Sequence, residues 1–243
     1  MKRLITMNNP QSPISEAYRG IRTSIQFSNL DKNIKVINIT SSKQGEGKTT
    51  VLTNLATTFA GLEKKVLILD GDLRNPGVHR AFEVSNIYGL TDVLLENKTF
   101  EECVHCTNIK NLHVLTCGPT PPNPSEMLAS KKMMEFIKKL REQYDYVFID
   151  TPPIGVVTDA GIVSTYSDGC IFVVGSKEVE IETVKIANKR LENVGANILG
   201  CILNKFEISK NGSDYYSHYY KEGRKFDKSK KKKKRKKSAE AMA

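Results

Sequence analysis

A glycine-rich segment that also carries a lysine and two threonines is the clearest site of chemistry in this sequence. Residues 42–50 read S-K-Q-G-E-G-K-T-T. A nucleoside triphosphate needs backbone N–H groups aimed at its oxygens, a cation near its β/γ bridge and a hydroxyl on Mg²⁺. This segment offers all three and therefore predicts a phosphate-binding loop. Its candidate residues are Lys43, Gln44, Gly45, Glu46, Gly47, Lys48, Thr49 and Thr50.

The loop departs from the usual G-x-x-x-x-G-K-[S/T] pattern, because Ser42 stands at the first glycine. A phosphate-binding loop also needs a buried strand before it and a helix after it. Residues 35–40 are rich in β-branched side chains, and residues 50–60 repeat apolar side chains at helical spacing up to Gly61. The N-terminus of that helix is then expected to face the phosphates.

Strand-like segments alternate with helical ones along most of the chain. This alternation predicts an α/β fold of the P-loop NTPase type, with a mainly parallel sheet flanked by helices on both faces. A proline-rich loop at 118–124 precedes a predicted helix at 125–142. The candidate strands are 36–40, 66–70, 112–116, 146–150, 169–174 and 198–203.

Acidic residues stand where two of these strands finish. Asp70 and Asp72 follow the second strand, and Asp150 ends the fourth. Parallel sheets bind ligands at the carboxyl ends of their strands. Each aspartate alone is compatible with a turn, but the three together with the loop favour a metal-binding and catalytic role.

Length and composition narrow the class of protein. The 243 residues suffice for one α/β domain with tails. Because we find neither a long apolar span nor an export signal, we expect a cytoplasmic protein with reduced thiols among its five cysteines. Cys103 and Cys106 spell C-x-x-C, but without a second close pair they are weak evidence for zinc.

Nearly all of the net charge lies at one end of the chain. The protein carries +10, and nine of the ten residues at 228–237 are basic. The remainder is close to neutral, which argues against a broad nucleic-acid-binding face on the domain.

Three further motifs make a family resemblance specific. Residues 69–76 read L-D-G-D-L-R-N-P, residues 117–126 read C-G-P-T-P-P-N-P-S-E, and residues 150–153 read D-T-P-P. With the loop, they resemble the bacterial tyrosine kinases of capsule and exopolysaccharide synthesis, specifically the kinase subunits of the Gram-positive type. These kinases are a branch of the MinD/ParA-like P-loop proteins. The resemblance covers about residues 15–204.

The resemblance implies ATP and Mg²⁺ as cofactors and a role for each site residue. Lys48 and the loop amides would neutralise the γ-phosphate, and Asp70 would activate the tyrosine hydroxyl. Thr49, Asp72 and Asp150 would hold Mg²⁺ or its waters. Asn204 would contact adenine. Lys43 stands where related ATPases carry a second lysine, so it either reaches phosphate or is a solvated loop residue.

An N-terminal motif and a tyrosine cluster separate this family from its ATPase cousins. Glu16, Arg19 and Arg22 match E-x-x-R-x-x-R, whose spacing suits one helix face. It indicates either an intersubunit ion-pair ring or a solvated charged helix, and the other motifs favour oligomerisation. The second feature is a cluster of four tyrosines near the C-terminal end of the sequence. The family phosphorylates such tyrosine clusters on a neighbouring subunit, and the alternative is an aromatic patch that binds another protein or RNA. The candidate acceptors are Tyr215, Tyr216, Tyr219 and Tyr220.

The resemblance also implies partners and a location. A transmembrane activator would act in trans, and a cognate tyrosine phosphatase would reverse the reaction. The basic segment 228–237 departs from the family, and from its charge we expect it to hold the protein at the anionic inner face of the membrane. The resulting organisation is an oligomerisation segment at 1–32, a kinase domain at 33–207, a tyrosine tail at 208–227 and a polybasic tail at 228–243.

Two other functions remain open at this point. The main alternative is a MinD/ParA-like positioning ATPase with a membrane- or DNA-binding basic tail, which Lys43 and that tail would fit. The tyrosine cluster, the E-x-x-R-x-x-R motif and the P-P-N-P loop do not fit it. A nucleotide-binding adaptor without turnover would require idle carboxylates, for which we find no sequence evidence.

Overall fold

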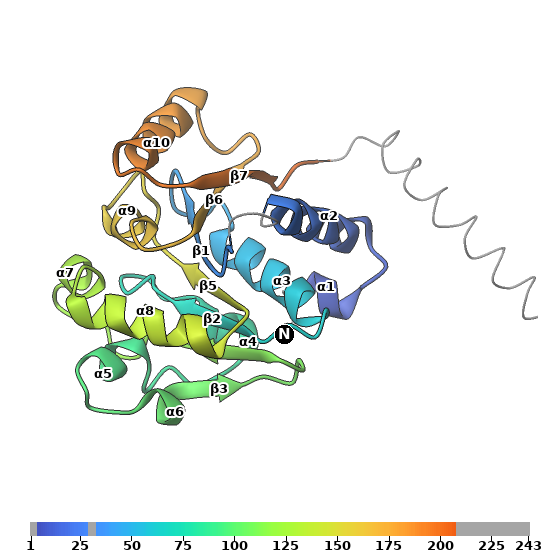
Figure 1. The fold of residues 1–243 in the computed structure, drawn as a ribbon. Helices are drawn as coiled ribbons and strands as arrows, with labels where there is room; N and C mark the ends of the chain where they lie inside the picture. Colours follow the sequence, from blue (N-terminus) through green and yellow to red (C-terminus); the bar gives the residue numbers. More distant parts are fainter. Residues whose placement is uncertain (1–3, 29–32, 208–243) are drawn as a thin grey trace, which may run out of the picture. The chain divides into compact units, whose positions relative to one another are not determined.

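The computed structural model describes residues 4–28 and 33–207. The chain divides after Lys205, and the fold below is that of the unit ending there. A seven-stranded sheet forms its centre, in the order β3-β4-β2-β5-β1-β6-β7 (Figure 1). The strands are β1 (Val36–Ser41), β2 (Val66–Asp70), β3 (Val104–Cys106), β4 (Leu112–Leu115), β5 (Tyr146–Asp150), β6 (Gly169–Gly175) and β7 (Ile198–Asn204).

The six strands predicted from the sequence are all present, and they pair in parallel. The additional strand β3 was not predicted. It pairs antiparallel with β4 at the sheet edge and spans only three residues, none of them fully buried, so it lacks the apolar run that reveals the others.

Helices cover both faces of the sheet (Figure 1). The longer ones, α2, α3, α8 and α10, each span more than ten residues, and the rest are short. The helices are α1 (Ile5–Asn8), α2 (Pro13–Ser28), α3 (Lys48–Ala60), α4 (Val78–Phe82), α5 (Leu90–Leu94), α6 (Phe100–Cys103), α7 (Pro124–Leu128), α8 (Lys131–Gln143), α9 (Asp159–Ser164) and α10 (Ile181–Asn193).

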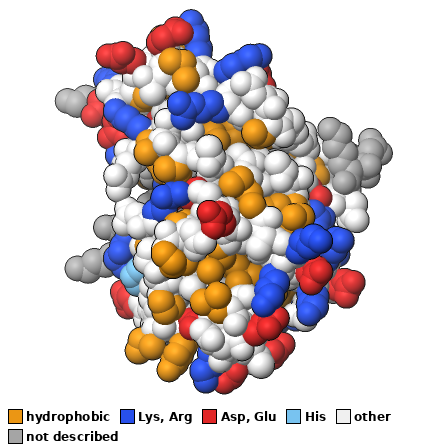
Figure 2. Space-filling view, turned by 90° about the vertical axis from the view of Figure 1, so that its left-hand side faces the viewer, with side chains coloured by type: hydrophobic (Ala, Val, Ile, Leu, Met, Phe, Trp, Pro, Cys, Tyr) orange, Lys and Arg blue, Asp and Glu red, His pale blue; other side chains and the backbone are white. Residues whose placement is uncertain are grey.

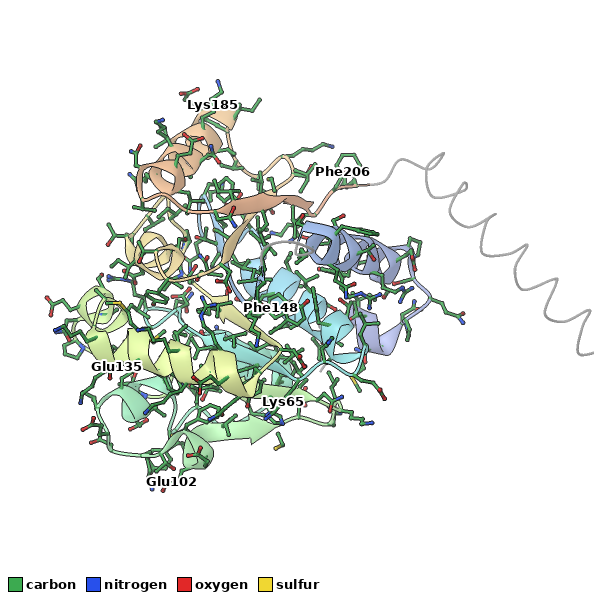
Figure 3. The ribbon with its side chains drawn as sticks, in the orientation of Figure 1. Lys65, Glu102, Glu135, Phe148, Lys185 and Phe206 are labelled. Atoms are coloured by element: carbon green, nitrogen blue, oxygen red, sulfur yellow. The ribbon has the colours of Figure 1, made fainter. Side chains whose placement is uncertain are left out.

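The central strands are apolar along their whole length because both of their faces are covered. In β2, Val66 and Ile68 join the core beneath α2 and α3, whereas Leu67 and Leu69 join the core beneath α8. Phe148, labelled in Figure 3, lies in the first of these layers with its ring centroid 5.3 Å from that of Phe59 on α3. Alternation along each strand therefore fills two separate cores.

The predicted helix at 125–142 is wrong as a single element. The structure has α7 and α8, separated by Ala129 and Ser130. Ser130 is extended, and its side chain accepts a hydrogen bond from the Met133 amide, so it begins a new helix instead of continuing the first.

Charges of both signs are mixed on the face seen in Figure 2. That view shows the left-hand side of Figure 1, where α7 and α8 lie, with apolar side chains gathered between acidic and basic ones. Among the described residues, neither sign of charge predominates on this face. The four tyrosines at 215–220 and the basic run at 228–237 lie outside the described residues.

Within the described residues, no helix combines the length and apolar character that a membrane crossing requires.

Candidate active site

The predicted acidic residues meet at one edge of the sheet. Asp70 and Asp150 are the last residues of β2 and β5, and they lie opposite each other in the register of these neighbouring strands. The strand β1 follows β5 in the sheet and leads directly into the glycine-rich loop. Parallel pairing therefore brings the loop and the carboxylates to the same edge.

The glycine-rich loop has the backbone conformation of a phosphate cradle. Gly45 and Gly47 have φ of +92° and +93°, a region that side chains disfavour. The helix α3 begins immediately afterwards at Lys48 and presents its N-terminus to the loop.

A cavity of about 610 Å³ opens beside this loop. Lys48, Thr49 and Asp72 are among its lining residues. The Lys48 ammonium lies 3.8 Å from an Asp72 carboxylate oxygen, and the Thr49 hydroxyl donates a 2.5 Å hydrogen bond to Asp150. The loop residues that line the cavity are Gln44, Gly45, Gly47, Lys48, Thr49 and Thr50.

Two of the carboxylates have an oxygen without a partner. Asp70 is fully buried, and one of its oxygens accepts 3.0 Å hydrogen bonds from the amides of Gly77 and Val78. Among the described residues, its other oxygen finds no hydrogen-bond donor, and the same holds for one oxygen of the fully buried Asp150. Buried oxygens without donors are expensive, so the pair suits a cation or a shared proton.

The electrostatics agree with this interpretation. Burial, together with the charge of Asp150, raises the pKa of Asp70. Burial also raises the pKa of Asp150, although the Lys48 charge and the Thr49 hydroxyl oppose the rise. Burial likewise raises the pKa of Asp72 against the Asn75 amide and Lys48. Oxygen ligands are those Mg²⁺ prefers, and a divalent cation would relieve the repulsion among the three.

Two predicted nucleotide-binding residues of the loop turn away from the cavity. The Glu46 side chain is fully buried behind the loop, where it accepts hydrogen bonds from Ser42, Lys43 and Gly175. The Lys43 ammonium donates to the carbonyl of Glu178 in the loop after β6. Neither side chain lines the cavity.

Asn204 lies against the loop, with its amide nitrogen 2.8 Å from the Glu46 carbonyl oxygen. The cavity-lining residues do not include it. Its predicted contact with adenine is not tested by this arrangement.

Sequence reasoning missed an ion pair beside the cavity. Arg74, which lines the cavity, donates hydrogen bonds of 2.8 and 3.1 Å to the two oxygens of the fully buried Asp159. Ser125 bonds to both partners at 2.8 Å. These residues join the loops after β2, β4 and β5. Arg74 belongs to the quoted L-D-G-D-L-R-N-P segment, but no local signal pointed to Asp159.

The N-terminal motif divides between two surroundings. Glu16 and Arg19 form a 2.6 Å ion pair within α2. Arg22 instead donates a 2.8 Å hydrogen bond to the Thr58 carbonyl in the last turn of α3. In this chain the three side chains therefore do not act as one free cluster.

The C-x-x-C pair is split as well, because Cys103 is buried and Cys106 is exposed. Across residues 4–28 and 33–207, no group of three or more His, Cys, Asp and Glu side chains is arranged to hold a metal ion by protein ligands alone. Binding of Mg²⁺ at the acidic edge would thus draw on the threonine hydroxyl, water and phosphate oxygens, as is usual for that ion.

The fold and this site together define a P-loop nucleotide-binding protein. In agreement, a family model described as an AAA domain matches residues 34–199. The tyrosine-protein kinase YwqD of Bacillus subtilis is 44% identical over 218 residues, which cover 90% of this chain and 91% of YwqD. The tyrosine-protein kinase CpsD of Streptococcus pneumoniae is 39% identical over 211 residues, covering 86% and 92%.

Solved structures distinguish the two candidate branches. A crystal structure of the chimerical protein CapA2B2 is 40% identical, covers 86% of this chain and 92% of its own, and superposes with a TM-score of 0.83. The septum site-determining protein MinD of Pyrococcus horikoshii, complexed with Mg-ADP, is 30% identical over 74% of this chain and 73% of its own, with a TM-score of 0.61. The chain belongs to the bacterial protein-tyrosine kinases of capsule synthesis.

Proposed function

We propose that the kinase binds ATP with Mg²⁺ in the cavity and transfers the γ-phosphate to tyrosines 215, 216, 219 and 220 of a neighbouring subunit, thereby regulating polysaccharide synthesis and export. One observation carries the proposal: the phosphate-binding loop meets Asp70, Asp72 and Asp150 at a single edge of the sheet, where two buried carboxylate oxygens lack donors among the described residues. MinD, a solved structural relative, is complexed with Mg-ADP.

Phosphoryl transfer depends mainly on alignment and charge neutralisation. Lys48 and Asp72 both line the cavity, 3.8 Å apart, so the Lys48 ammonium would contact phosphate oxygens bound there. Thr49 and Asp150, already hydrogen-bonded to each other, would hold Mg²⁺ or its waters together with Asp72. When bound, Mg²⁺ would neutralise charge that develops on the phosphates.

Asp70 is the candidate that accepts the proton of the attacking tyrosine hydroxyl. A phenol has a pKa of about 10, so a base with a raised pKa is better matched to it than an ordinary carboxylate. Burial beside Asp150 raises the pKa of Asp70 in this direction.

The deciding experiment maps phosphate by mass spectrometry on protein purified from its own host, in wild type and in Lys48→Met. We expect phosphate on the tyrosines at 215–220 in wild type and its loss in the variant, because methionine keeps the length of the side chain but removes the charge. The host supplies any activator.

The matched control for this experiment is Lys185→Met on α10, where Lys185 lies on the surface and points outward in Figure 3. Unmodified tyrosines in the wild-type protein, alongside intact ATP hydrolysis, would contradict the proposed transfer. Loss of phosphate in both variants would indicate a nonspecific effect.

The proposed partners follow from the family. They are further copies of this chain, arranged as a ring through Glu16, Arg19 and Arg22, a transmembrane activator acting in trans, and a tyrosine phosphatase.

The basic run at 228–237 is proposed to hold the kinase at an anionic membrane surface. Each Lys or Arg near such a surface contributes on the order of 1 kcal/mol, and phosphate on nearby tyrosines would offset that attraction. We expect the full chain to bind phosphatidylserine vesicles at low salt, and a chain lacking 228–237 to lose most of this binding. Equal vesicle binding by both proteins would rule the anchor out.

A further inference from the structure

The carboxylate of Glu46 is a buried charge that the proposed chemistry does not use. One oxygen accepts hydrogen bonds from the Ser42 hydroxyl at 2.8 Å and the Lys43 amide at 2.7 Å. The other accepts from the amide of Gly175, the last residue of β6, at 2.9 Å. Gly175 is 129 positions away in sequence. The side chain therefore fastens the front of the loop to the end of a neighbouring strand.

The end of β7 holds the same loop by its carbonyl groups. The Asn204 amide nitrogen donates to the Glu46 carbonyl, and the Lys205 ammonium donates to the Gly45 carbonyl, each at 2.8 Å. Lys205 is itself held by the Glu178 carboxylate at 2.7 and 2.8 Å. Two successive carbonyls of the loop are thus held by side chains at the end of β7.

Holding these carbonyls also sets the amides of the loop. In a planar trans peptide the C=O and the N–H of one unit point in opposite directions. With the Gly45 and Glu46 carbonyls bonded to β7 side chains, the N–H groups of Glu46 and Gly47 must point to the other side of the loop. Gly45, Gly47 and Lys205 all line the cavity, so the held part of the loop borders the proposed nucleotide site.

We propose that Glu46 is a positioning residue for nucleotide binding, which, with Asn204 and Lys205, fixes the loop amides before the nucleotide arrives. The proposal rests on the nucleotide site proposed above. It also explains the departure from the usual motif, because Ser42 supplies a hydroxyl donor to Glu46 where glycine would supply none.

The sign of one substitution separates positioning from simple electrostatics. A buried negative charge behind a phosphate site repels phosphate. If charge were the main effect, Glu46→Gln would tighten nucleotide binding. If position is the main effect, Glu46→Gln weakens nucleotide binding. Glutamine replaces one of the two carboxylate oxygens by an NH₂ group, which cannot accept a hydrogen bond, so either Gly175 or the pair Ser42 and Lys43 loses its acceptor.

The experiment titrates a fluorescent ADP analogue with Mg²⁺ into the full-length chain carrying Glu46→Gln, Glu46→Ala or Lys205→Met. We expect dissociation constants to rise in the order wild type, Gln, Ala, with the alanine variant about 10- to 100-fold weaker. The charge-matched control is Glu182→Gln, an exposed pair partner of Lys185 on α10, which should stay within about twofold.

A second measurement needs no nucleotide and also shows whether each variant is folded. In nucleotide-free protein, ¹⁵N–¹H spectra should show the Gly175 amide signal displaced by Glu46→Gln and the Gly45 and Gly47 amide signals displaced by Lys205→Met, with all three unmoved by Glu182→Gln.

Folded Glu46 variants with wild-type affinity, or tighter binding by Glu46→Gln, would overturn the inference. Failure of the wild-type protein to bind the nucleotide would instead overturn the proposed function. The amide signals would then still decide whether Glu46 positions the loop.

Discussion

Two properties of Asp70 disfavour its ionisation. It is fully buried and lies opposite Asp150 on the next strand, so ionisation of both is unfavourable, and its pKa is raised. A carboxylate kept in this state costs the folded protein stability at neutral pH. Such a cost is expected of the acidic Mg²⁺ site proposed above.

We predict that Asp70→Asn stabilises the nucleotide-free protein in a pH-dependent way. The folded state of the wild type holds its proton to higher pH than the unfolded chain does, so its stability falls as pH rises from the ordinary carboxyl pKa through the raised one. Asparagine removes this loss and keeps an acceptor for Gly77 and Val78. The free energy of unfolding of the variant should exceed that of the wild type by about 1–2 kcal/mol near pH 8 and should be nearly equal to it near pH 4.

Denaturant unfolding at these two pH values measures the effect, with Mg²⁺ and nucleotide absent. Kinase activity should be lost in the same variant. A variant that is less stable than wild type near pH 8 would show that Asp70 stabilises the fold.

Elements meet at the site through Asp159 rather than through the sheet alone. The carboxylate begins α9, and its bonds to Arg74 and Ser125 connect the loop after β2 with the start of α7. The loop after β2 and the starts of α7 and α9 all follow the carboxyl ends of strands. Their relative position therefore determines where Arg74 lies in the cavity.

We predict that Asp159→Asn weakens nucleotide binding more than it weakens the fold. The change removes the charge that holds Arg74, and the exposed guanidinium can then turn to solvent. The free energy of unfolding should fall by about 1–2 kcal/mol, while KM for ATP rises severalfold. Steady-state kinetics and thermal unfolding measure the two effects.

Asp168→Asn is the matched control for this prediction. Asp168 forms a comparable 2.8 Å pair with Arg141 and also accepts from the Val36 amide at the start of β1, the end of the sheet opposite the site. It should lower stability and leave KM unchanged. A rise in KM in both variants would trace the effect to general loosening of the fold.

At the scale of the whole molecule, the question is how copies of this chain assemble. The E-x-x-R-x-x-R motif is predicted to link subunits, and within one chain Arg22 donates a hydrogen bond to the Thr58 carbonyl at the C-terminal end of α3. The positive charge of Arg22 also interacts favourably with the partial negative charge at the C-terminus of α3. Glu16 and Arg19 form an ion pair within α2, in which Glu16 is exposed and Arg19 also donates a 2.8 Å hydrogen bond to the Pro10 carbonyl.

We predict opposite effects for the two ends of the motif. Arg22→Ala should lower the melting temperature of the isolated chain, because the Thr58 carbonyl loses its donor. Glu16→Ala should change stability by less than about 1 kcal/mol but reduce assembly, since the exposed Glu16 carboxylate can face another subunit. Sedimentation velocity with thermal unfolding distinguishes them, and unchanged assembly in Glu16→Ala would exclude Glu16 from the interface.

Much of this protein could be predicted from short stretches of sequence. The six parallel strands are continuous apolar runs buried on both faces, so local composition reveals them. The glycines, Lys48 and Thr49 are specified by their own spacing, and the aspartates by their places at strand ends. The short antiparallel strand β3 and the break between α7 and α8 escaped because neither has a strong local pattern.

The sequence by itself determined the chemistry of the site: a phosphate-binding loop, three strand-end carboxylates and the motifs of a tyrosine kinase. Only the tertiary structure decided which polar side chains face the cavity and which are bound elsewhere in the fold. Glu46 faces inward to Gly175, Asn204 reaches the loop from β7, and Asp159 captures Arg74. The partners in each pair lie far apart in the chain. Such pairs form only when the completed sheet brings strand ends together, and no local spacing encodes that encounter.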